Sequence, residues 1–173
     1  MSVLIRARAL NRGCWFEILD VDHLATSDDG TLLPSSNILR AQQMCIDMCD
    51  RFNRSLRIPL KFQDMMLQAG FKNVTRVKMQ LPMNGWPKDR QLKELGIKAM
   101  PVHKQIIKDE LAPTISSPDQ KTVVDAVLSG CLQEMEDESI HAYMPLWVPL
   151  FSSLPTEACP VDYWSNTPRT ADM

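Results

Sequence analysis

Four aspartates near the beginning of the chain are the residues whose types and spacing could support chemistry. Asp20 and Asp22 close a mostly apolar run, and Asp28 and Asp29 follow in a loop of turn-forming residues. In open α/β sheets, ligands bind beyond the carboxyl ends of the strands, so acids at such an end could orient a substrate or assist its deprotonation. The alternative, which the polar composition of ordinary loops favours, is that these acids cap and solvate the loop.

A histidine and a few aromatic residues are the other candidates. His141 could act as a general base because imidazole titrates near neutral pH, and it could equally be a hydrogen-bonded structural residue. Trp86 and Tyr143, together with Trp147, could line an aromatic substrate pocket, although core packing is the more frequent role of such side chains. The sequence holds no nucleophile triad, metal-ligand cluster or phosphate-binding loop.

Composition places the chain among ordinary globular proteins. Its 173 residues fit one domain, and a content of 45% hydrophobic and 23% charged residues argues against wholesale disorder. A net charge of −2 gives no electrostatic case for a nucleic-acid binder. No apolar run approaches bilayer-spanning length, and Arg6 and Arg8 interrupt the segment where a signal peptide needs its apolar core. We therefore expect a soluble protein of the cytoplasm or nucleus that acts on a small molecule, without a nucleic-acid or membrane partner.

The cysteines do not indicate a metal site. They are five, an odd number without a CxxC pair, and they stand at positions 14, 45, 49, 131 and 159. The histidines at positions 23, 103 and 141 are scattered and supply no cluster of ligands. We expect reduced, buried thiols and no bound metal.

The first aspartates are positioned by a strand that we predict over residues 15–22, since its β-branched and aromatic residues are typical of a buried strand. A helix is predicted over 2–12, and Gly13 suits the left-handed residue beyond a helix end. Ser35 or Ser36 can cap the next helix, which runs to about residue 56 as one apolar stripe.

The central part of the chain alternates in the same way. A shorter helix is predicted over 60–69, and a strand over 73–81 with one wetter face, which favours a place near a sheet edge. The turn-rich segment 82–87 connects this strand to a helical stretch over 88–111, which we expect to be interrupted near Gly96 and Pro101.

The last two predicted elements bring the chain back to the sheet. Ser117 caps a helix that begins with a proline, carries a glutamine three residues after the cap and runs to about residue 135. A final strand is predicted over 140–148, and the proline within it favours an edge position or a bulge. From Pro149 onward we expect a poorly ordered tail.

Five blocks of this sequence resemble a known family. They are RALNRGCWFEILDVD, SDDGTL, LQAGFKNV, LPMNGWPKDRQLKELG and IHAY, and they stand in the order and spacing of that family. The family comprises the fungal S-adenosylmethionine-dependent methyltransferases related to the secondary-metabolism regulator of the velvet complex. The chain resembles their C-terminal half over residues 6–148, with a looser match within 97–135.

This resemblance implies an α/β fold with a partial Rossmann-like methyltransferase sheet. Residues 15–22 would form the fifth strand of a seven-stranded sheet, and 73–81 and 140–148 would form its last two. Residues 1–148 would then be a partial methyltransferase-like domain, followed by the tail over 149–173. The resemblance also implies methyl transfer from S-adenosylmethionine to a small molecule or a protein, within natural-product pathways.

One part of the family pattern has no counterpart here. Such enzymes hold the cofactor with a Gly-rich loop after the first strand and an acid at the end of the second. None of the six glycines of this chain stands in a GxG pattern. We therefore expect that the N-terminal cofactor-binding half is not in this sequence and that no residue of the chain binds S-adenosylmethionine directly.

Three functions from different classes remain open. The first is a truncated protein of the methyltransferase family. The second is a remnant that works as a pathway cyclase or isomerase without a methyl donor. The third is a non-catalytic partner or regulatory subunit, which follows from the edge of strand 15–22: without its neighbouring strand, this edge would pair with another protein or with a second copy of the chain.

Overall fold

The computed structural model describes residues 15–68 and 71–152. In chain order, the strands are β1 (Trp15–Glu17), β2 (Asp20–Val21), β3 (Lys72–Pro82) and β4 (Tyr143–Ser152). The helices are α2 (Asn37–Arg51), α3 (Phe62–Gln68), α4 (Arg90–Leu111) and α5 (Pro118–Glu136), with short 3₁₀ turns η1 (Ile58–Lys61) and η2 (Ala112–Thr114). The chain is thus an α/β protein, as the sequence predicts. The predicted helix over 2–12 and most of the predicted tail lie outside the described residues.

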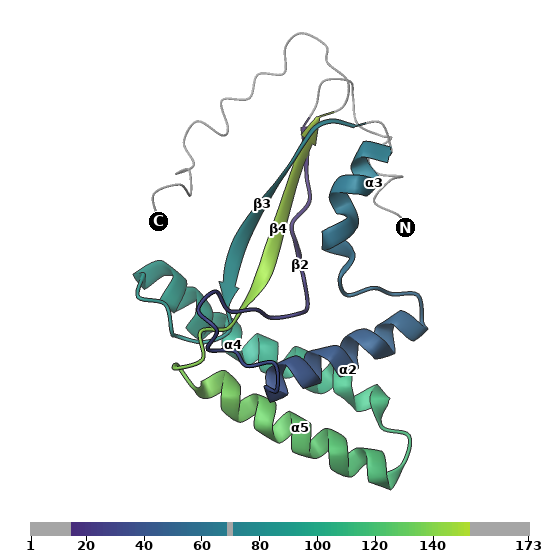
Figure 1. The fold of residues 1–173 in the computed structure, drawn as a ribbon, viewed down its shortest axis with the longest axis vertical. Coiled ribbons are helices and arrows are strands. Elements are labelled where there is room, and N and C mark those ends of the chain that lie inside the picture. The colour runs from purple at the N-terminus through teal and green to yellow at the C-terminus, as the bar shows by residue number, and fades with distance from the viewer. Residues whose placement is uncertain (1–14, 69–70, 153–173) are drawn as a thin grey trace.

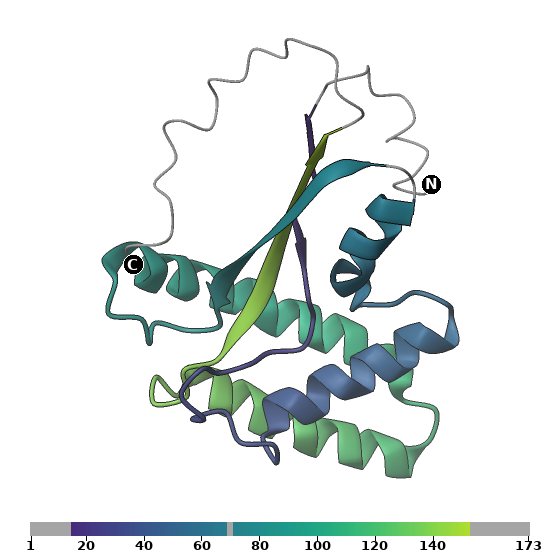
Figure 2. The same cartoon turned by 45° about the horizontal axis from the view of Figure 1, so that its top comes forward.

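The strands form one small antiparallel sheet with β4 in its middle. β1 and β2 pair with one side of β4, and β3 pairs with the other side. Figure 1 shows the strands rising from a layer formed by α2, α4 and α5, while α3 lies beside the upper part of the sheet. The same arrangement is visible from a second direction in Figure 2.

The position of β4 corrects the prediction for the final strand. Its two prolines, Pro145 and Pro149, lie within the central strand and not at an edge. Both prolines face the β1–β2 side, because Asp22 N and Ile18 N donate to Pro145 O and Pro149 O at 2.9 and 3.3 Å. The side that pairs with β3 therefore keeps its backbone donors, since successive residues of a strand point to opposite sides. The strand also continues to Ser152, so the segment 149–152 belongs to the sheet and not to the predicted tail.

The same prolines explain why the strand predicted over 15–22 is broken into β1 and β2. The register is unchanged across the break, since Glu17 pairs with Leu150 and Val21 pairs with Leu146. Two residues opposite each other in an antiparallel pair normally exchange two N–H···O hydrogen bonds. Proline has no N–H to donate, so Ile18 and Asp22 each form only one of the two bonds with their proline partner. The first strand is consequently held by fewer bonds than β3.

The helix layer encloses the main core. Ser36 begins α2 as predicted, because its hydroxyl accepts a hydrogen bond from Ile38 N, although the helix ends at Arg51 and not near residue 56. Ser117 caps α5 by accepting from Gln120 N. The buried apolar side chains of this layer include Ile38, Ala41 and Cys45 from α2, Ile107 and Leu111 from α4, and Val124, Val127, Cys131 and Met135 from α5.

α4 is continuous, which corrects the predicted interruption near Gly96 and Pro101. Pro101 lacks the N–H that would bond the carbonyl one helical turn earlier. Because Pro101 is exposed, that carbonyl is on the solvent side of the helix. Gly96 is buried, and a Cβ at this position would come within 1.9 Å of Asn84 O. The glycine thus lets α4 pack directly on the connector after β3, so it serves a close contact and does not end the helix.

Candidate functional site

Three segments that are distant in the sequence meet at one end of the sheet. The loop with Asp28 and Asp29 follows β2, the connector with Trp86 follows β3, and His141 directly precedes β4. Because β4 runs antiparallel to its neighbours, its beginning lies beside the ends of β2 and β3. The structure therefore gathers the predicted candidates from all three segments into one place.

One short contact of this group joins a histidine to a carboxylate. His141 Nδ1 lies 2.5 Å from Asp29 Oδ2. The other oxygen of Asp29 accepts from Ser27 Oγ at 2.5 Å, from Thr31 Oγ1 at 2.8 Å and from Thr31 N at 3.1 Å. These hydrogen bonds hold the pKa of the Asp29 carboxyl far below its usual range, and the bond from Ser27 has the largest effect. Asp29 is therefore an acceptor at physiological pH, and the proton in the His141 contact resides on Nδ1.

The imidazole of His141 is fixed from two further directions. Its backbone N donates to Thr31 Oγ1 at 2.8 Å, so the loop holds both the main chain and the ring. The indole of Trp86 stacks on the ring with 4.8 Å between centroids and 24° between planes. Trp86 is itself held by a hydrogen bond from Nε1 to Ala142 O at 3.0 Å. With Nδ1 bonded to Asp29, the lone pair on Nε2 remains as the basic position of His141.

Asp28 belongs to a second hydrogen-bonded group beside the first. It accepts from Tyr143 Oη at 2.5 Å and from Gln80 Nε2 at 2.9 Å. Lys78 Nζ donates to the same Tyr143 hydroxyl at 2.7 Å. Burial and the bond to Asp28 raise the pKa of Tyr143. Lys78 and Gln80 were not among the candidates predicted from the sequence, although their alternation with apolar residues along the strand predicts a polar face there.

Tyr143 does not line a substrate pocket, because its side chain is fully buried. Its role in substrate binding therefore stays a prediction from the sequence. Its hydroxyl links Asp28 to Lys78, so its role is to hold the Asp28–Asp29 loop against β3 and β4. Trp86, in contrast, is half-buried and Asp29 is exposed, and both contact the imidazole of His141.

Asp20 and Asp22 lie outside this group, and their role as catalytic candidates stays a prediction. Asp22 is 2% exposed and forms a two-pronged ion pair with Arg57, with both nitrogen–oxygen distances at 2.9 Å. A buried carboxylate that is already paired has no free oxygen for a substrate proton. Asp20 Oδ1 accepts from the next backbone N, that of Val21.

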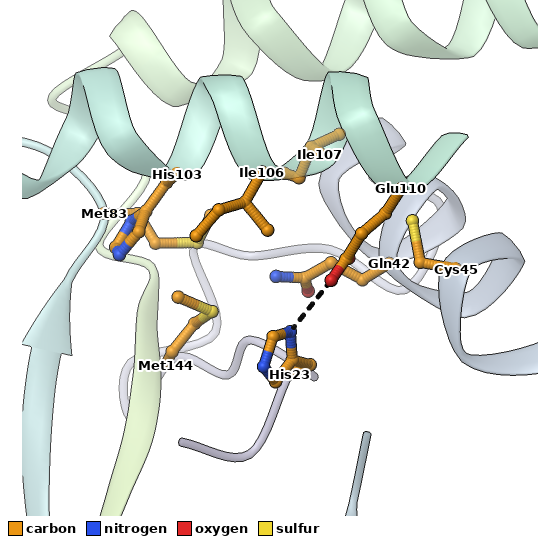
Figure 3. Close-up of a pocket in the computed structure, with 9 residues that line it drawn as sticks. All are labelled: His23, Gln42, Cys45, Met83, His103, Ile106, Ile107, Glu110 and Met144. Carbon is orange, nitrogen blue, oxygen red and sulfur yellow. Dashed lines mark ion pairs between the residues drawn. The ribbon is translucent and has the colours of Figure 1, made fainter. Parts of the chain in front are cut away.

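Two hollows of the protein lie away from the His141–Asp29 pair. One is a cavity with a volume of about 20 Å³. Its lining residues, drawn in Figure 3, are His23, Gln42, Cys45, Met83, His103, Ile106, Ile107, Glu110 and Met144. Its volume suits one water molecule, so it is too small for a methyl acceptor. A wider hollow of about 520 Å³ lies between α2 and α5, and its lining includes none of the candidate residues. We therefore base the site on the His141 geometry.

The thiols and the glycines of the described residues offer little for a metal or a cofactor. Burial raises the pKa of Cys45 and of Cys131 to about 12, so both are inert thiols. Within residues 15–68 and 71–152, no group of three or more candidate ligands is arranged to hold a metal ion. The glycines of these ranges do not form a cradle either: Gly85, Gly96 and Gly130 each pack against a neighbour, and Gly30 stands alone in a turn. These residues do not fit S-adenosylmethionine.

Comparison with known proteins identifies fungal relatives. The chain is 27% identical over 139 residues to methyltransferase cpsF of Aspergillus campestris, a match that covers 78% of this chain and 48% of the relative. It is 29% identical over 146 residues to the probable methyltransferase tdiE of Emericella nidulans, covering 81% and 45%. It is 26% identical over 159 residues to the protein-methionine methyltransferase laeA of Chaetomium globosum, covering 90% and 47%.

These relatives confirm the resemblance that the sequence blocks predict. They are fungal methyltransferases and secondary-metabolism regulators, at low identity over much of the chain. The chain spans about half the length of the curated relatives it matches. No protein-family model matches it. Among the residues that the structure describes, no helix has the length and apolar character needed to cross a membrane.

Proposed function

We propose that this chain forms the substrate-side half of an S-adenosylmethionine-dependent methyltransferase that acts in fungal secondary metabolism. The names of the relatives support methyl transfer and this metabolic setting. The sheet supports the assignment of the strand over 15–22, β3 and β4 as the last three strands of a larger sheet, because they pair with one another and leave the outer side of β1 and β2 open. S-adenosylmethionine would supply the methyl group, and its binding residues lie in the other half of such an enzyme.

The observation that carries this proposal is the contact between His141 and Asp29. Methyl transfer to oxygen or nitrogen requires that the acceptor loses a proton. His141 presents Nε2 as a base, while Asp29 fixes the tautomer and stabilises the imidazolium that forms when the proton arrives. Trp86 keeps the ring in orientation and offers an aromatic surface to the substrate.

A chimeric enzyme tests this function. In the Aspergillus campestris relative, this chain replaces the half that it matches, and transfer of a labelled methyl group to that enzyme's own acceptor is measured. We expect activity that falls by about 100-fold in His141→Gln, since a positioned base typically contributes this much. Glu138→Gln, an exposed acid near the same end, serves as the matched control. A folded chimera that binds the cofactor and loses no activity in His141→Gln contradicts the role of His141.

A second candidate function is a cyclisation or isomerisation that needs no methyl donor. It is favoured by the fact that the base and its orienting acid are complete within this chain, whereas the described glycines form no cofactor cradle. Calorimetric titration of the full chain with S-adenosylmethionine, with S-adenosylhomocysteine for comparison, tests this second candidate. Saturable micromolar binding of S-adenosylmethionine contradicts a donor-free reaction, whereas a folded chain that binds neither compound is the result that both candidates expect, and activity of the chimera then decides between them.

A further inference from the structure

The cavity drawn in Figure 3 lies between the loop after β2 and the helices α2 and α4. Its polar lining comes from all three of these segments: His23 of the loop, Gln42 of α2, and His103 and Glu110 of α4. Its volume of about 20 Å³ exceeds the roughly 10–15 Å³ that one water molecule requires, and a buried water also needs roughly two to four polar partners. The polar atoms around the cavity therefore decide whether it is wet or dry.

His103 contributes a buried nitrogen that needs a partner. The residue is 5% exposed, and its Nδ1 has no hydrogen-bond partner among the described residues. A buried nitrogen of this kind is nearly always hydrogen-bonded, either to protein or to ordered water. Water can donate to an imidazole nitrogen or accept from it, so a water molecule in the cavity suits either tautomer of His103.

The contact between His23 and Glu110 is long enough to be bridged. His23 Nδ1 and Glu110 Oε1 are 3.8 Å apart, whereas a direct N–H···O bond measures about 2.7–3.2 Å. Polar groups that face each other across more than about 3.5 Å are often joined by a water molecule. The two side chains are 28% and 24% exposed, so this pair also marks the side from which water enters the cavity.

Gln42 contributes a donor from α2. The residue is 4% exposed, and its Oε1 accepts from Ala25 N at 2.8 Å. This bond occupies the carbonyl oxygen of the side chain, so the amide nitrogen Nε2 remains as a donor. Figure 3 shows this nitrogen on the side of the amide that faces into the cavity. Three segments of the chain thus present polar atoms to one water-sized space.

We propose that this cavity binds one ordered water molecule, which hydrogen-bonds to His103 Nδ1 and Gln42 Nε2 and bridges to the His23–Glu110 pair. The water fastens the loop after β2 to α2 and α4, beside the direct bond between Gln42 and Ala25. Because the same loop continues to Asp28 and Asp29, this anchor helps to position the candidate site. The inference does not depend on the reaction that the site performs.

Water-selective nuclear Overhauser spectra of the full chain, with labelled methionine methyl groups, test this site. Met83 lines the cavity and is fully buried, so bulk water does not reach its methyl group. We expect a cross-peak between the Met83 methyl group and a long-lived water. Met135 is equally buried but does not line the cavity, so it is the internal control and should show no such cross-peak.

A substitution at His103 tests which residue holds the water. His103→Phe keeps an aromatic ring and removes both nitrogens. It should abolish the water contact at Met83, and it should speed amide exchange at Ala25, because Gln42 loses the water that helps to orient its side chain. Gln105→Leu, at an exposed position of the same helix, is the matched control and should change neither measurement.

Three results would overturn the inference. A folded wild-type protein without water contact at Met83 has a dry cavity. An undiminished contact in His103→Phe shows that His103 does not hold the water, and unchanged exchange at Ala25 in a variant that has lost the water shows that the water does not fasten the loop. If His103→Phe does not fold, His103→Leu takes its place, and the wild-type spectrum alone decides whether the cavity is occupied.

Discussion

At the scale of single residues, the His141–Asp29 pair is built to present one nitrogen. Asp29 accepts hydrogen bonds from Ser27 and Thr31 of its own loop in addition to its contact with the imidazole, so the loop sets its position. The ring then takes its orientation from Asp29 on one side and from the Trp86 stack on the other. Because the position of Asp29 is set first and the ring depends on it, a change at Asp29 should alter the tautomer and orientation of His141 without unfolding the protein.

Chemical modification measures this dependence. Diethyl pyrocarbonate acylates unprotonated imidazole nitrogens, and we expect His141 to react faster than the buried His103. Asp29→Asn should slow the modification of His141 several-fold, because an amide stabilises neither the Nδ1–H tautomer nor the developing charge. Asp28→Asn is the control, since Asp28 contacts Tyr143 and Gln80 and not the imidazole. Equal rates in both variants, followed by peptide mass spectrometry, would contradict the pairing.

His103 makes stability depend on pH. Burial, with His23 nearby, lowers the pKa of His103 from 6.5 to about 4, and its Nδ1 has no hydrogen-bond partner among the described residues. The unfolded chain therefore binds this proton first as pH falls, so the stability that neutral His103 provides is complete above pH 6.5 and is lost toward pH 4. Between pH 7 and pH 5 we expect a loss of about 2 kcal/mol in the free energy of unfolding.

Urea unfolding of the wild-type protein and of His103→Leu at both pH values checks this expectation. Between pH 7 and pH 5, the free energy of unfolding of His103→Leu should fall by about 2 kcal/mol less than that of the wild-type protein, because leucine has no group that titrates. The stabilisation from Asp29 and Glu134, whose pKa values are lowered, is present above the ordinary carboxylate pKa and is lost as pH falls from that value toward the lowered one, so it changes little between pH 7 and pH 5. Identical pH profiles of the two proteins would show that His103 is not buried in its neutral form.

At the scale of elements, one carboxylate joins two helices. Glu134 of α5 accepts from Asn37 N at 2.9 Å and from Ile38 N at 3.0 Å, which are the first amides of α2. It also accepts from the hydroxyl of the capping residue Ser36 at 2.6 Å. Burial alone would raise the pKa of Glu134, but these hydrogen bonds together lower it. The beginning of α2 is thus capped from another helix as well as by its own serine.

Removing the Glu134 carboxylate should weaken the contact between α5 and the beginning of α2. We expect Glu134→Ala to lower the free energy of unfolding by about 2 kcal/mol, since it leaves helix N-terminal amides without an acceptor in a partly buried contact. Glu136→Ala is the matched control: it lies two residues further on the same helix and its exposed carboxylate pairs with Lys104. Urea unfolding of both variants measures the difference, and a loss in Glu134→Ala no larger than in the control would refute the capping role.

At the scale of the whole molecule, the sheet is unequally held on its two sides. Backbone donors of β4 that point to β3 are intact, whereas two of those that would point to β1 and β2 are prolines. Hydrogen exchange should therefore be slowest at Leu146 and Val148 and clearly faster at Ile18 and Asp22. Exchange measured by NMR in native conditions tests this, and equal protection on both sides of β4 would contradict it.

The sequence by itself determined the order of the elements and the local signals that begin them. The caps at Ser36 and Ser117 were predictable because a hydroxyl bonds an amide two or three residues away, and the alternation over 73–81 specified a strand near an edge. The loop with Asp28 and Asp29 was predictable as a turn for the same reason, since turn-forming residues after a strand are a local pattern. The resemblance to fungal methyltransferases is likewise a property of the sequence.

Only the tertiary structure decided which candidates lie together. Asp22 faces Arg57, a residue 35 positions away, and this pairing removes it from the site. Tyr143 is buried and Trp86 reaches His141 because β4 lies between its neighbours, a topology that sequence patterns do not fix. The sequence pattern placed β4 at an edge because residue preferences describe a single strand. Whether a strand can accommodate a proline, which lacks a backbone N–H, depends on the neighbouring strand that this position faces.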